Sequence, residues 1–490
     1  MKKNAIKIIA FLVAVVLTFA GMEYVLSFKY LDSTFKADSF YKQEENTVDV
    51  LVLGSSHAYQ GLNTAVFWQE YGIAAFNFCG AAQPIWNTYY YLEEALKTQT
   101  PKVIIFDTYY LHMSEDFSEA SFAIKNTYGL KWSETKIEAI KASFDTQEDD
   151  KQYLFEILQY HSRYSDLNKT DFFTYQGNKD MYENHKGFYC YFNSSAVTER
   201  DLSNVVYLNY MTEKSQFYYR KIFELAKEKN IPIIAVAIPF NAEPYHQAYF
   251  NEAKIIAEEY NAPFYNFNTD YKAQLGIDYS TDFADNQHLN YLGNTKLTRF
   301  FGELLTNEYN VPDRRGDATY SSWEADAQVF YKQLENHNVT KITSLTDYAE
   351  IFKNERYKIV VTSSLYDFDS IPDAARVSMM YFFKRLEVPK SEYSKGGMWI
   401  FENGEKTYYN DCSGSNFSKA VSLGRYDGIA VKPVEHTMDE TQTLSVNSIF
   451  ANKKDVTVSD YGLNIYVYDN FTQTKVDLVG LNYSNNQLVR

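Results

Sequence analysis

Residues 50–57 read Val-Leu-Val-Leu-Gly-Ser-Ser-His, an apolar run that ends abruptly in a glycine and a polar loop. The run, counted from residue 48 to residue 54, has the length and composition of a buried β-strand. Comparable apolar runs recur downstream and are separated by helix-like segments; they lie at residues 74–78, 103–106, 233–238 and 263–267. This alternation is typical of parallel strands covered by helices on both faces. It predicts an α/β fold with a three-layer, doubly wound parallel sheet.

The chain has 490 residues, more than one hydrophobic core usually organises, so at least two globular units are expected. The alternating pattern spans residues 48–308. Residues 110–205 interrupt it with aromatic and charged segments, which predict a helical insertion of the kind that forms a lid or a substrate wall. Residues 309–318 contain proline, two arginines and glycine and predict a linker. Residues 319–490 then form a smaller accessory α+β domain. Its strands are expected at 357–362, 397–402, 428–431 and 463–468, and its helix at 374–386.

The N-terminus predicts a membrane segment. Three lysines precede an uncharged run at residues 8–22, the pattern of a helix that enters a bilayer from its basic side. Fifteen residues at about 1.5 Å each cover roughly 22 Å of a hydrocarbon core of about 30 Å, unless Tyr24, Val25 and Leu26 extend the run past Glu23. Residues 1–27 are therefore expected to be either an uncleaved anchor in a bacterial cell membrane, with the globular part outside the cytoplasm, or a signal peptide whose cleavage releases a secreted protein. Residues 28–47 are polar and predict a stalk.

Composition excludes several classes of protein. The 47 basic and 63 acidic residues give a formal charge of −16, which repels nucleic acid. Three widely spaced cysteines predict no disulfide framework. No metal-binding motif and no glycine-rich phosphate loop is present in the sequence, so neither a metal nor another cofactor is expected. The 44 tyrosines could stack on sugars, although a codon bias explains them more simply.

Three residue types with complementary chemistry follow the predicted strands. A serine hydroxyl needs a base to become a nucleophile at neutral pH, and an imidazole base needs a carboxylate to fix its tautomer. Ser56 follows the first strand, and Asp285 and His288 lie in a loop after the last one. Because the carboxyl ends of parallel strands share one edge of a sheet, we expect these side chains to meet there. The alternatives are that Ser56 only caps a helix, that His288 is a surface residue, and that Asp282 replaces Asp285.

Both loops resemble end motifs of the SGNH, or GDSL-like, superfamily. The loop 54–57, Gly-Ser-Ser-His, resembles the first block of that family, with Ser56 in the place of the nucleophile and Ser55 replacing an aspartate. It differs from the Gly-x-Ser-x-Gly elbow of α/β-hydrolases because no second glycine follows. Asp285 and His288, followed by Leu-Asn-Tyr-Leu-Gly, resemble the last block, Asp-x-x-His. The resemblance covers roughly the first 308 residues.

The resemblance also implies an oxyanion pocket. It would combine the backbone amide of Ser56 with that of Gly80, which stands after the second strand. In the third block, where many members carry Gly-x-Asn-Asp, this chain reads Phe-Asp-Thr-Tyr at residues 106–109. The missing asparagine donor needs a substitute, because losing one such donor costs about 3 kcal/mol elsewhere. Three side chains could serve: Gln83, Asn87 and Thr108.

Two further residues are expected beside the reaction centre. Asp107 ends the third strand and either lines the site or only terminates the strand. His57 follows the nucleophile directly, and successive side chains diverge, so a substrate contact or simple packing is favoured over a role as the base.

The resemblance extends to membrane-anchored SGNH-like proteins of teichoic-acid modification and alginate O-acetylation, which also tend to lack the full third block. It implies a serine acyltransferase. A membrane-bound acyltransferase would donate the acyl group, which would pass through an acyl-serine to a hydroxyl of a cell-envelope polysaccharide or teichoic acid. Two alternatives stay open: a carbohydrate esterase with the same triad, and a catalytically weak glycan-binding scaffold.

Overall fold

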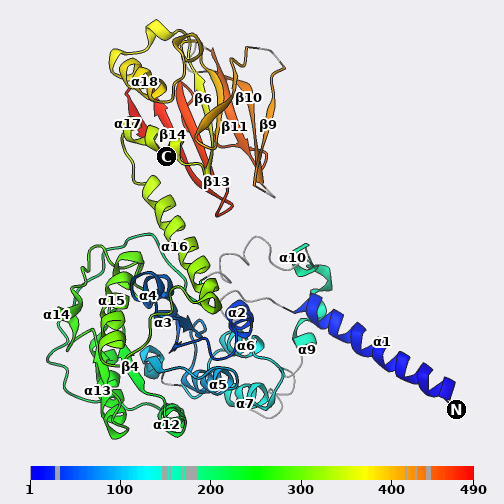
Figure 1. The fold of residues 1–490 in the computed structure, drawn as a ribbon, viewed down its shortest axis with the longest axis vertical. Coiled ribbons are helices and arrows are strands. Elements are labelled where there is room, and N and C mark those ends of the chain that lie inside the picture. The colour runs from blue at the N-terminus through cyan, green and yellow to red at the C-terminus, as the bar shows by residue number, and fades with distance from the viewer. Residues whose placement is uncertain are drawn as a thin grey trace. The chain divides into compact units, whose positions relative to one another are not determined.

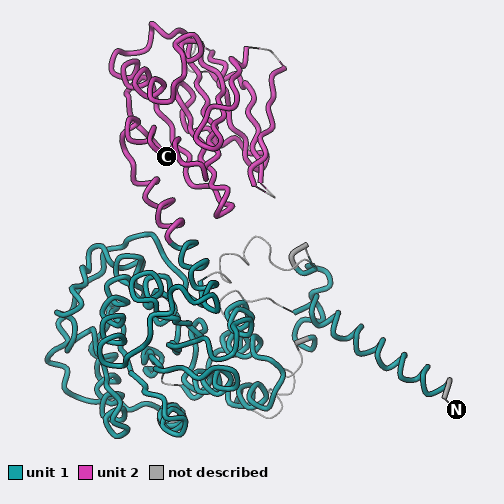
Figure 2. Tube along the Cα trace, viewed as in Figure 1, with its two compact units in different colours: residues 1–330 teal, residues 331–490 magenta. Residues whose placement is uncertain are grey.

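The computed structural model divides the chain into two compact units, residues 1–330 and 331–490 (Figure 2). The division falls inside one helix, α16 (Ser321–Val339). The structure describes residues 2–27, 34–113, 115–145, 153, 156–167, 169–172, 185–413, 416–424, 427–437 and 443–490.

The first unit is built on a five-stranded parallel sheet with the order β2-β1-β3-β4-β5 (Figure 1). The strands are β1 (Val50–Leu53), β2 (Ala75–Asn77), β3 (Val103–Asp107), β4 (Ile233–Ala237) and β5 (Phe264–Asn266). Every residue of the first four strands is buried, which explains their unbroken apolar sequence. The predicted strands and the α/β class are confirmed.

Helices follow the strands as the sequence pattern predicted. They are α3 (Ser56–Gly61), α4 (Thr64–Tyr71), α5 (Ile85–Ala95), α12 (Glu213–Glu228), α13 (Pro244–Glu259) and α15 (Tyr291–Asn307), with a short α14 (Lys272–Leu275). The crossover from β1 to β2 runs one way along the sheet, and the later crossovers run the other way. Right-handed connections therefore place their helices on opposite faces. In agreement, α12 contacts α5, whereas α15 contacts α3 and α4. The sheet is covered on both sides.

The insertion is helical as far as Phe172 where the structure describes it, whereas its last described part, residues 185–205, contains no helix. The helical part contains η2 (Tyr109–His112), α6 (Ala120–Tyr128), α7 (Glu134–Ser143), α9 (Glu156–Tyr160), η3 (His161–Ser165) and α10 (Lys169–Phe172). Helix α7 contacts both α5 and α6, so this part of the insertion packs on the α5 side of the sheet. The parts of the predicted insertion at 146–152, 154–155 and 173–184 lie outside the described residues.

Helix α1 (Lys2–Leu26) is long and apolar enough to be a membrane anchor or a signal sequence. Its apolar stretch, Asn4–Leu26, has 23 residues, which cover about 35 Å at 1.5 Å per residue. The run expected from the sequence was shorter because it stopped before Glu23, through which the helix continues. The full helix can therefore reach across a hydrocarbon core of about 30 Å.

The predicted stalk is wrong for its larger part. Residues 28–33 lie outside the described residues, but α2 (Lys36–Tyr41) belongs to the folded unit. The Phe40 side chain is 1% exposed. Its ring stacks on that of Phe78, with 4.2 Å between centroids, and meets Phe76 edge-on at 5.1 Å. The flanking polar residues concealed this apolar anchor in the sequence.

The predicted linker at 309–318 is also part of the first unit. Arg314 donates two hydrogen bonds to the carboxylate of Asp49, at 2.7 and 2.8 Å, and its backbone N–H donates to the Gly72 carbonyl. Val311 is buried. The segment with the proline and glycine therefore packs along the first unit. The boundary between the two units falls only later, within α16.

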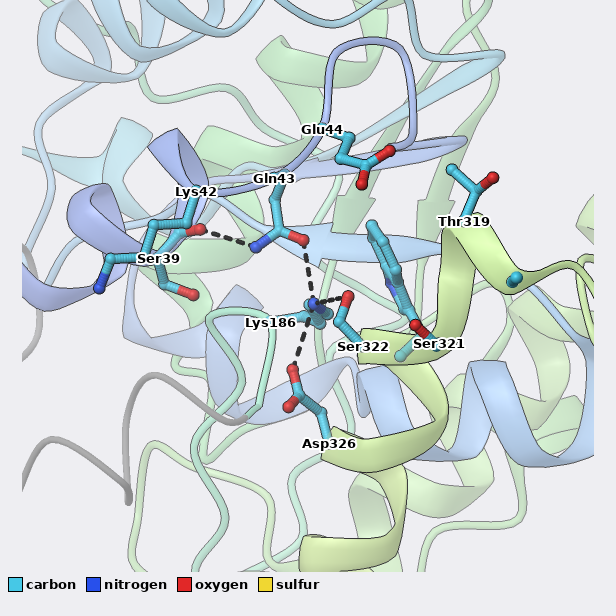
Figure 3. Close-up of a pocket in the computed structure, with 11 residues that line it drawn as sticks. Ser39, Lys42, Gln43, Glu44, Lys186, Thr319, Ser321, Ser322 and Asp326 are labelled. Atoms are coloured by element: carbon cyan, nitrogen blue, oxygen red, sulfur yellow. Dashed lines mark hydrogen bonds and ion pairs between the residues drawn. The ribbon is translucent and has the colours of Figure 1, made fainter.

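A buried lysine fastens the start of α16 to the first unit (Figure 3). The ammonium of Lys186 donates to Gln43 Oε1 at 2.9 Å and to Ser322 Oγ at 2.8 Å, and it lies 3.3 Å from Asp326 Oδ2. It also lies 4.1 Å from the centroid of the Trp323 ring. These partners line a polar cavity of about 340 Å³. Burial raises the pKa of the Asp326 carboxyl to about 6, against the opposing effect of the Lys186 charge.

Replacing Lys186 by methionine should lower the free energy of unfolding of the chain. The substitution leaves the Asp326 carboxylate buried without its cation, which costs about 3–5 kcal/mol in comparable pairs. Chemical denaturation followed by circular dichroism at neutral pH would measure the loss. The double variant Lys186→Met, Asp326→Leu should recover most of it, because no charge is then left unpaired. Equal stabilities of the single and double variants would contradict this account.

The second unit contains two antiparallel sheets, with the orders β15-β14-β13-β6-β7-β8 and β12-β11-β10-β9. The strands of the larger sheet are β6 (Tyr357–Ser364), β7 (Gly397–Glu402), β8 (Glu405–Asn410), β13 (Gly462–Asp469), β14 (Thr474–Asn482) and β15 (Gln487–Val489). Those of the smaller sheet are β9 (Lys419–Leu423), β10 (Asp427–Thr437), β11 (Thr443–Ala451) and β12 (Lys454–Asp455). Helices α17 (Leu345–Tyr348), α18 (Asp373–Arg385) and α19 (Lys390–Tyr393) complete it.

The sequence predicted β6, β7, the first part of β10, β13 and the helix α18. It missed strands such as β8, all of whose residues are at least partly exposed, because a polar strand lacks a continuous apolar signal.

Candidate active site

Ser56 is positioned by a tight turn at the carboxyl end of β1. The turn begins at Gly54, whose φ is +135°, and a β-carbon there would lie 2.7 Å from Cβ of Asp107. Only glycine fits this turn. Ser55 then caps α3, because its hydroxyl accepts the N–H of His57. Ser56 is the first residue of α3, so its own N–H has no acceptor inside the helix. Its side chain is half-buried.

Gly54→Ala should therefore damage both the fold and the site. The new methyl group meets Asp107 in a backbone conformation that other residues rarely adopt, and the combined cost is about 2–4 kcal/mol of unfolding free energy. A displacement of Ser56 by about 1 Å would lower turnover roughly 100-fold in addition. Gly276→Ala is the matched control, because Gly276 also has a positive φ, of +60°, but open space around it. Similar losses of turnover in both variants would contradict the prediction.

A second tight loop presents His288. Phe283 pairs with Leu289 in a short bridge, and the Ala284 N–H donates to the His288 carbonyl. Asn290 ends the loop and caps α15 by accepting the N–H groups of the two residues after Tyr291. This explains the Leu-Asn-x-x-Gly sequence: the leucine is buried, the asparagine caps the helix, and the glycine passes the Asp282 carbonyl too closely for a side chain.

The structure brings Ser56, His288 and Asp285 into one hydrogen-bonded chain. His288 Nε2 lies 2.9 Å from Ser56 Oγ, and His288 Nδ1 lies 3.0 Å from each carboxylate oxygen of Asp285. Asp285 Oδ1 also accepts the backbone N–H groups of Gln287 and His288. With Nδ1–H donating to the carboxylate, Nε2 is left to accept the serine proton. The sequence-based expectation placed these three residues together, and they lie together here.

The electrostatics of Asp285 fit its position. Partial burial favours its neutral form, but the hydrogen bonds from His288 and from the backbone of Gln287 outweigh burial and lower the pKa of the carboxyl. The side chain is 51% exposed, whereas that of His288 is only 14% exposed. The carboxylate is therefore ionised at neutral pH and partly screened by solvent.

Asp282, the alternative partner, does not face the histidine. Its Oδ2 accepts hydrogen bonds from Lys296 Nζ at 2.6 Å and from the Asp278 N–H at 2.8 Å. Its side chain is buried, so it holds the loop to α15. The structure therefore pairs His288 with Asp285.

The glycine expected in the oxyanion pocket already has a partner. Gly80 follows β2 beside the end of β1, where the Phe78 N–H donates to the Val52 carbonyl. The Gly80 N–H donates to Gln83 Oε1 at 2.5 Å. Gln83 Nε2 is buried and, among the described residues, has no hydrogen-bond partner. Of the donors named from the sequence, the Ser56 N–H and this amide nitrogen have no hydrogen-bond acceptor in the part of the chain that the structure describes.

Asn87 and Thr108, the other proposed substitutes, are committed elsewhere. Asn87 exchanges hydrogen bonds with Ser143 of α7, at 3.2 and 3.3 Å. The Thr108 hydroxyl donates to the Val236 carbonyl at 2.9 Å, which continues the pairing of β3 with β4. Both side chains are fully buried. Each already has a structural partner that sequence alone did not reveal, so their hydrogen bonds favour Gln83 over both as the substitute donor.

Asp107 lies beneath the nucleophile turn. Its Oδ2 accepts the Ser55 hydroxyl at 3.2 Å and its Oδ1 accepts the Tyr109 N–H at 3.3 Å. Ser55, which replaces the aspartate of the first block, thus links the turn to β3. Burial raises the pKa of Asp107 to about 7, although these hydrogen bonds oppose the rise.

Asp107 should make the stability of the fold depend on pH. Its pKa is raised from 3.8 to about 7, so the folded chain keeps a proton that the unfolded chain has lost between these values. The free energy of unfolding therefore falls as the pH rises through this window. Asp107→Asn cannot titrate, so it removes this pH-dependent change in the free energy of unfolding, which amounts to roughly 2–4 kcal/mol. Denaturation curves at several pH values should show a shallower decline for Asp107→Asn than for the wild type. Parallel pH profiles would refute this role.

His57 is a packing residue. It is 2% exposed, and its ring stacks on that of Tyr109 with 3.5 Å between centroids. Burial, reinforced by the nearby His288, lowers its pKa well below the usual value, so it is neutral. Its ring lies 5.2 Å from that of His288. A neutral neighbour leaves His288 free to accept the positive charge.

The end of the insertion forms a wall that the sequence did not predict in detail. The Tyr189 N–H donates to the Tyr59 carbonyl on α3, and Asn193 Nδ2 donates to the Ala284 carbonyl in the histidine loop. The Tyr191 ring lies 6.1 Å from the His288 ring. The run Gly-Phe-Tyr-Cys-Tyr-Phe-Asn at 187–193 was the available signal. Of its aromatic residues Phe188 is buried, and Tyr189, Tyr191 and Phe192 are half-buried.

Within the described ranges, no group of three or more histidine, cysteine or acidic side chains is arranged to hold a metal ion. No protein-family model matches the chain, and a search of curated proteins returns no match.

Proposed function

We propose that this chain is an SGNH-type serine enzyme that transfers acyl groups through an acyl-serine intermediate on Ser56. The observation that carries the proposal is the 2.9 Å separation of His288 Nε2 and Ser56 Oγ, two atoms on loops 232 residues apart. The sheet order β2-β1-β3-β4-β5, with the serine after β1 and the histidine just before α15, supports the SGNH assignment.

The chemistry follows from the hydrogen-bond chain. His288 takes the Ser56 proton as Oγ attacks the carbonyl carbon of the acyl donor, and Asp285 stabilises the imidazolium that forms. The tetrahedral intermediate collapses, the donor oxygen leaves with the proton from His288, and the acyl-serine remains. An acceptor hydroxyl then loses its proton to His288 and attacks the ester. The acyl group moves to the acceptor, and Ser56 regains its proton.

The oxyanion is stabilised by donors at the start of α3 and in the turn after β2. The Ser56 N–H is one of them, because the first residue of a helix has no acceptor within it. The uncommitted Nε2 of Gln83 is the second. A pocket that loses one such donor loses about 3 kcal/mol of transition-state stabilisation, so Gln83 offsets the absent third-block asparagine.

The acceptor is a hydroxyl of a cell-envelope polysaccharide or teichoic acid. Helix α1 supports this choice, since an uncleaved anchor holds the site close to a membrane-bound acyltransferase that supplies the acyl group outside the cytoplasm of a bacterium. Transfer and hydrolysis differ only in which oxygen attacks the acyl-serine. The aromatic wall at 187–193 favours transfer, because it limits the access of water to His288. An esterase would use the same residues.

A serine-directed fluorophosphonate tests the proposal. The full-length chain in detergent should gain the mass of one adduct, and peptide mapping should place the adduct on Ser56. Partition between a sugar acceptor and water, measured with an activated ester, then separates transferase from esterase. An unlabelled wild-type chain would refute both enzymes.

One observation favours a second candidate, a glycan-binding scaffold with weak catalysis. Gly80, Asn87 and Thr108 all have hydrogen-bond partners within the protein, which leaves a sparse oxyanion pocket. Polysaccharide binding that is unchanged by Ser56→Ala, together with no ester turnover by the wild type, would establish the scaffold instead.

A further inference from the structure

A cavity of about 400 Å³ lies among α5, α7 and α12, and no residue of the Ser56 relay lines it. Helix α5 contacts both α7 and α12, and Figure 1 shows the three helices in one part of the first unit. Most of its lining is of two kinds, tyrosine or phenylalanine rings and glutamate carboxylates. The proposed acyl transfer uses none of these side chains.

Three tyrosine rings form a corner of the cavity. The rings of Tyr89 and Tyr90 lie 5.1 Å apart at 73°, and each lies within 6 Å of Tyr218, at angles of 54° and 56°. The hydroxyls of Tyr90 and Tyr218 are hydrogen-bonded at 3.2 Å, which fixes two of the three walls. A sugar ring usually stacks on a single flat aromatic face. The three tyrosine rings are inclined to one another, an arrangement that suits a compact, rounded ligand group better than a flat one.

The cavity carries a negative charge. Glu93, Glu134 and Glu138 line it together with one cation, Lys221. Glu138 is also ion-paired with Lys141 at 2.7 Å, so the excess of negative charge comes from Glu93 and Glu134. Lys221 lies toward the rim, with its ammonium 5.5 Å from the Phe217 centroid and 3.9 Å from a carboxylate oxygen on its own helix. Within the described residues, Glu93 and Glu134 form no ion pair.

The nearby carboxylates contribute to raising the pKa values of two of the tyrosines. Burial and the Glu93 charge raise the pKa of Tyr89. Burial, the hydrogen bond with Tyr218 and, to a smaller extent, the Glu138 charge raise the pKa of Tyr90. The carboxylates of Glu93 and Glu138 therefore lie close enough to act on the hydroxyls of Tyr89 and Tyr90.

We propose that this cavity binds an organic ammonium group, a cation that carries methyl or methylene substituents. The faces of aromatic rings attract cations electrostatically, and enclosure by several rings is how proteins recognise substituted ammonium groups. The carboxylates around Tyr89, Tyr90 and Tyr218 add charge attraction, and the ring surfaces accept the alkyl groups. A quaternary headgroup and a primary alkylamine share this chemistry.

Choline and its uncharged isostere, 3,3-dimethylbutan-1-ol, test the charge requirement directly. The full-length chain in a neutral maltoside detergent should bind choline saturably in calorimetric titration. The isostere should bind about tenfold more weakly or not at all, because it has the shape without the charge. n-Butylamine, as a third ligand, distinguishes a quaternary ammonium headgroup from a primary amine. Tighter binding of choline would indicate that the natural ligand is a quaternary headgroup, and tighter binding of butylamine would indicate a primary amine. Equal binding of choline and the isostere, or no binding of either cation, would overturn the proposal.

Variants locate the site. Tyr89→Leu and the isosteric Glu93→Gln should each weaken choline binding about fivefold or more. Tyr381→Leu, on an exposed tyrosine of the second unit, and Glu258→Gln, on the exposed surface of α13, are the matched controls and should leave it unchanged. Circular dichroism confirms that each variant is folded. Ser56→Ala should bind choline like the wild type, so failure of the acyl-transfer proposal would not affect this test. Binding of methyl glucoside that is lost in Tyr89→Leu, without choline binding, would assign the cavity to neutral sugars and refute the ammonium site.

Discussion

Ser56→Ala should lower ester turnover by about 10⁴- to 10⁶-fold while leaving the fold intact, because removing the nucleophile of a serine relay abolishes the acyl-enzyme route. The side chain is only half-buried, and its hydroxyl is bonded to His288, so no core contact is lost. Hydrolysis of a chromogenic acetyl ester by the full-length chain measures kcat/KM. Fluorophosphonate labelling measures the same loss without turnover.

The adjacent serine is the matched control for that experiment. Ser55→Ala removes the cap of α3 and the hydrogen bond to Asp107. It should cost about 1 kcal/mol of stability, yet it leaves the Ser56 hydroxyl in place. We expect Ser55→Ala to keep its fluorophosphonate adduct and Ser56→Ala to lose it. Loss of the adduct in Ser55→Ala and its retention in Ser56→Ala would identify Ser55 as the nucleophile and contradict the prediction.

Asp285→Asn should lower kcat by about 10²- to 10⁴-fold, the loss seen when the orienting carboxylate of such a relay becomes an amide. The asparagine can keep the two backbone N–H contacts through its oxygen. Its amide then faces His288 Nδ1, which favours the tautomer with the proton on Nε2. That nitrogen can no longer accept the Ser56 proton. The carboxylate is half-exposed, and solvent screening places the expected loss toward the lower end of the range.

Asp282→Asn separates a loss of orientation from a loss of stability. Asp282 lies in the same loop but binds Lys296 and the Asp278 N–H. Its substitution should lower the free energy of unfolding with little effect on kcat. Comparable losses of kcat in the two variants would mean that the loop, and not the Asp285 carboxylate, is what His288 requires.

The α/β class and most elements of the first unit were predictable because the sheet is covered on both faces. Each central strand is buried along its whole length and therefore reads as an unbroken apolar run. The same reasoning failed for α2, whose buried Phe40 stands among polar neighbours, and for the segment containing Arg314, which reads as a linker but pairs with Asp49. Those outcomes depend on single long-range contacts, which leave no periodic signal in the sequence.

The sequence by itself determined which residues could perform acyl transfer and in what order along the chain they stand. A serine after the first parallel strand and an Asp-x-x-His loop after the last one converge wherever parallel strands share an edge. Only the tertiary structure decided which neighbours are free to take part. Gln83 keeps an uncommitted amide nitrogen, whereas Asn87 and Thr108 are held by Ser143 and Val236. The physical reason is that the hydrogen-bond partners of these side chains lie in distant segments of the sequence. Only folding brings them within reach.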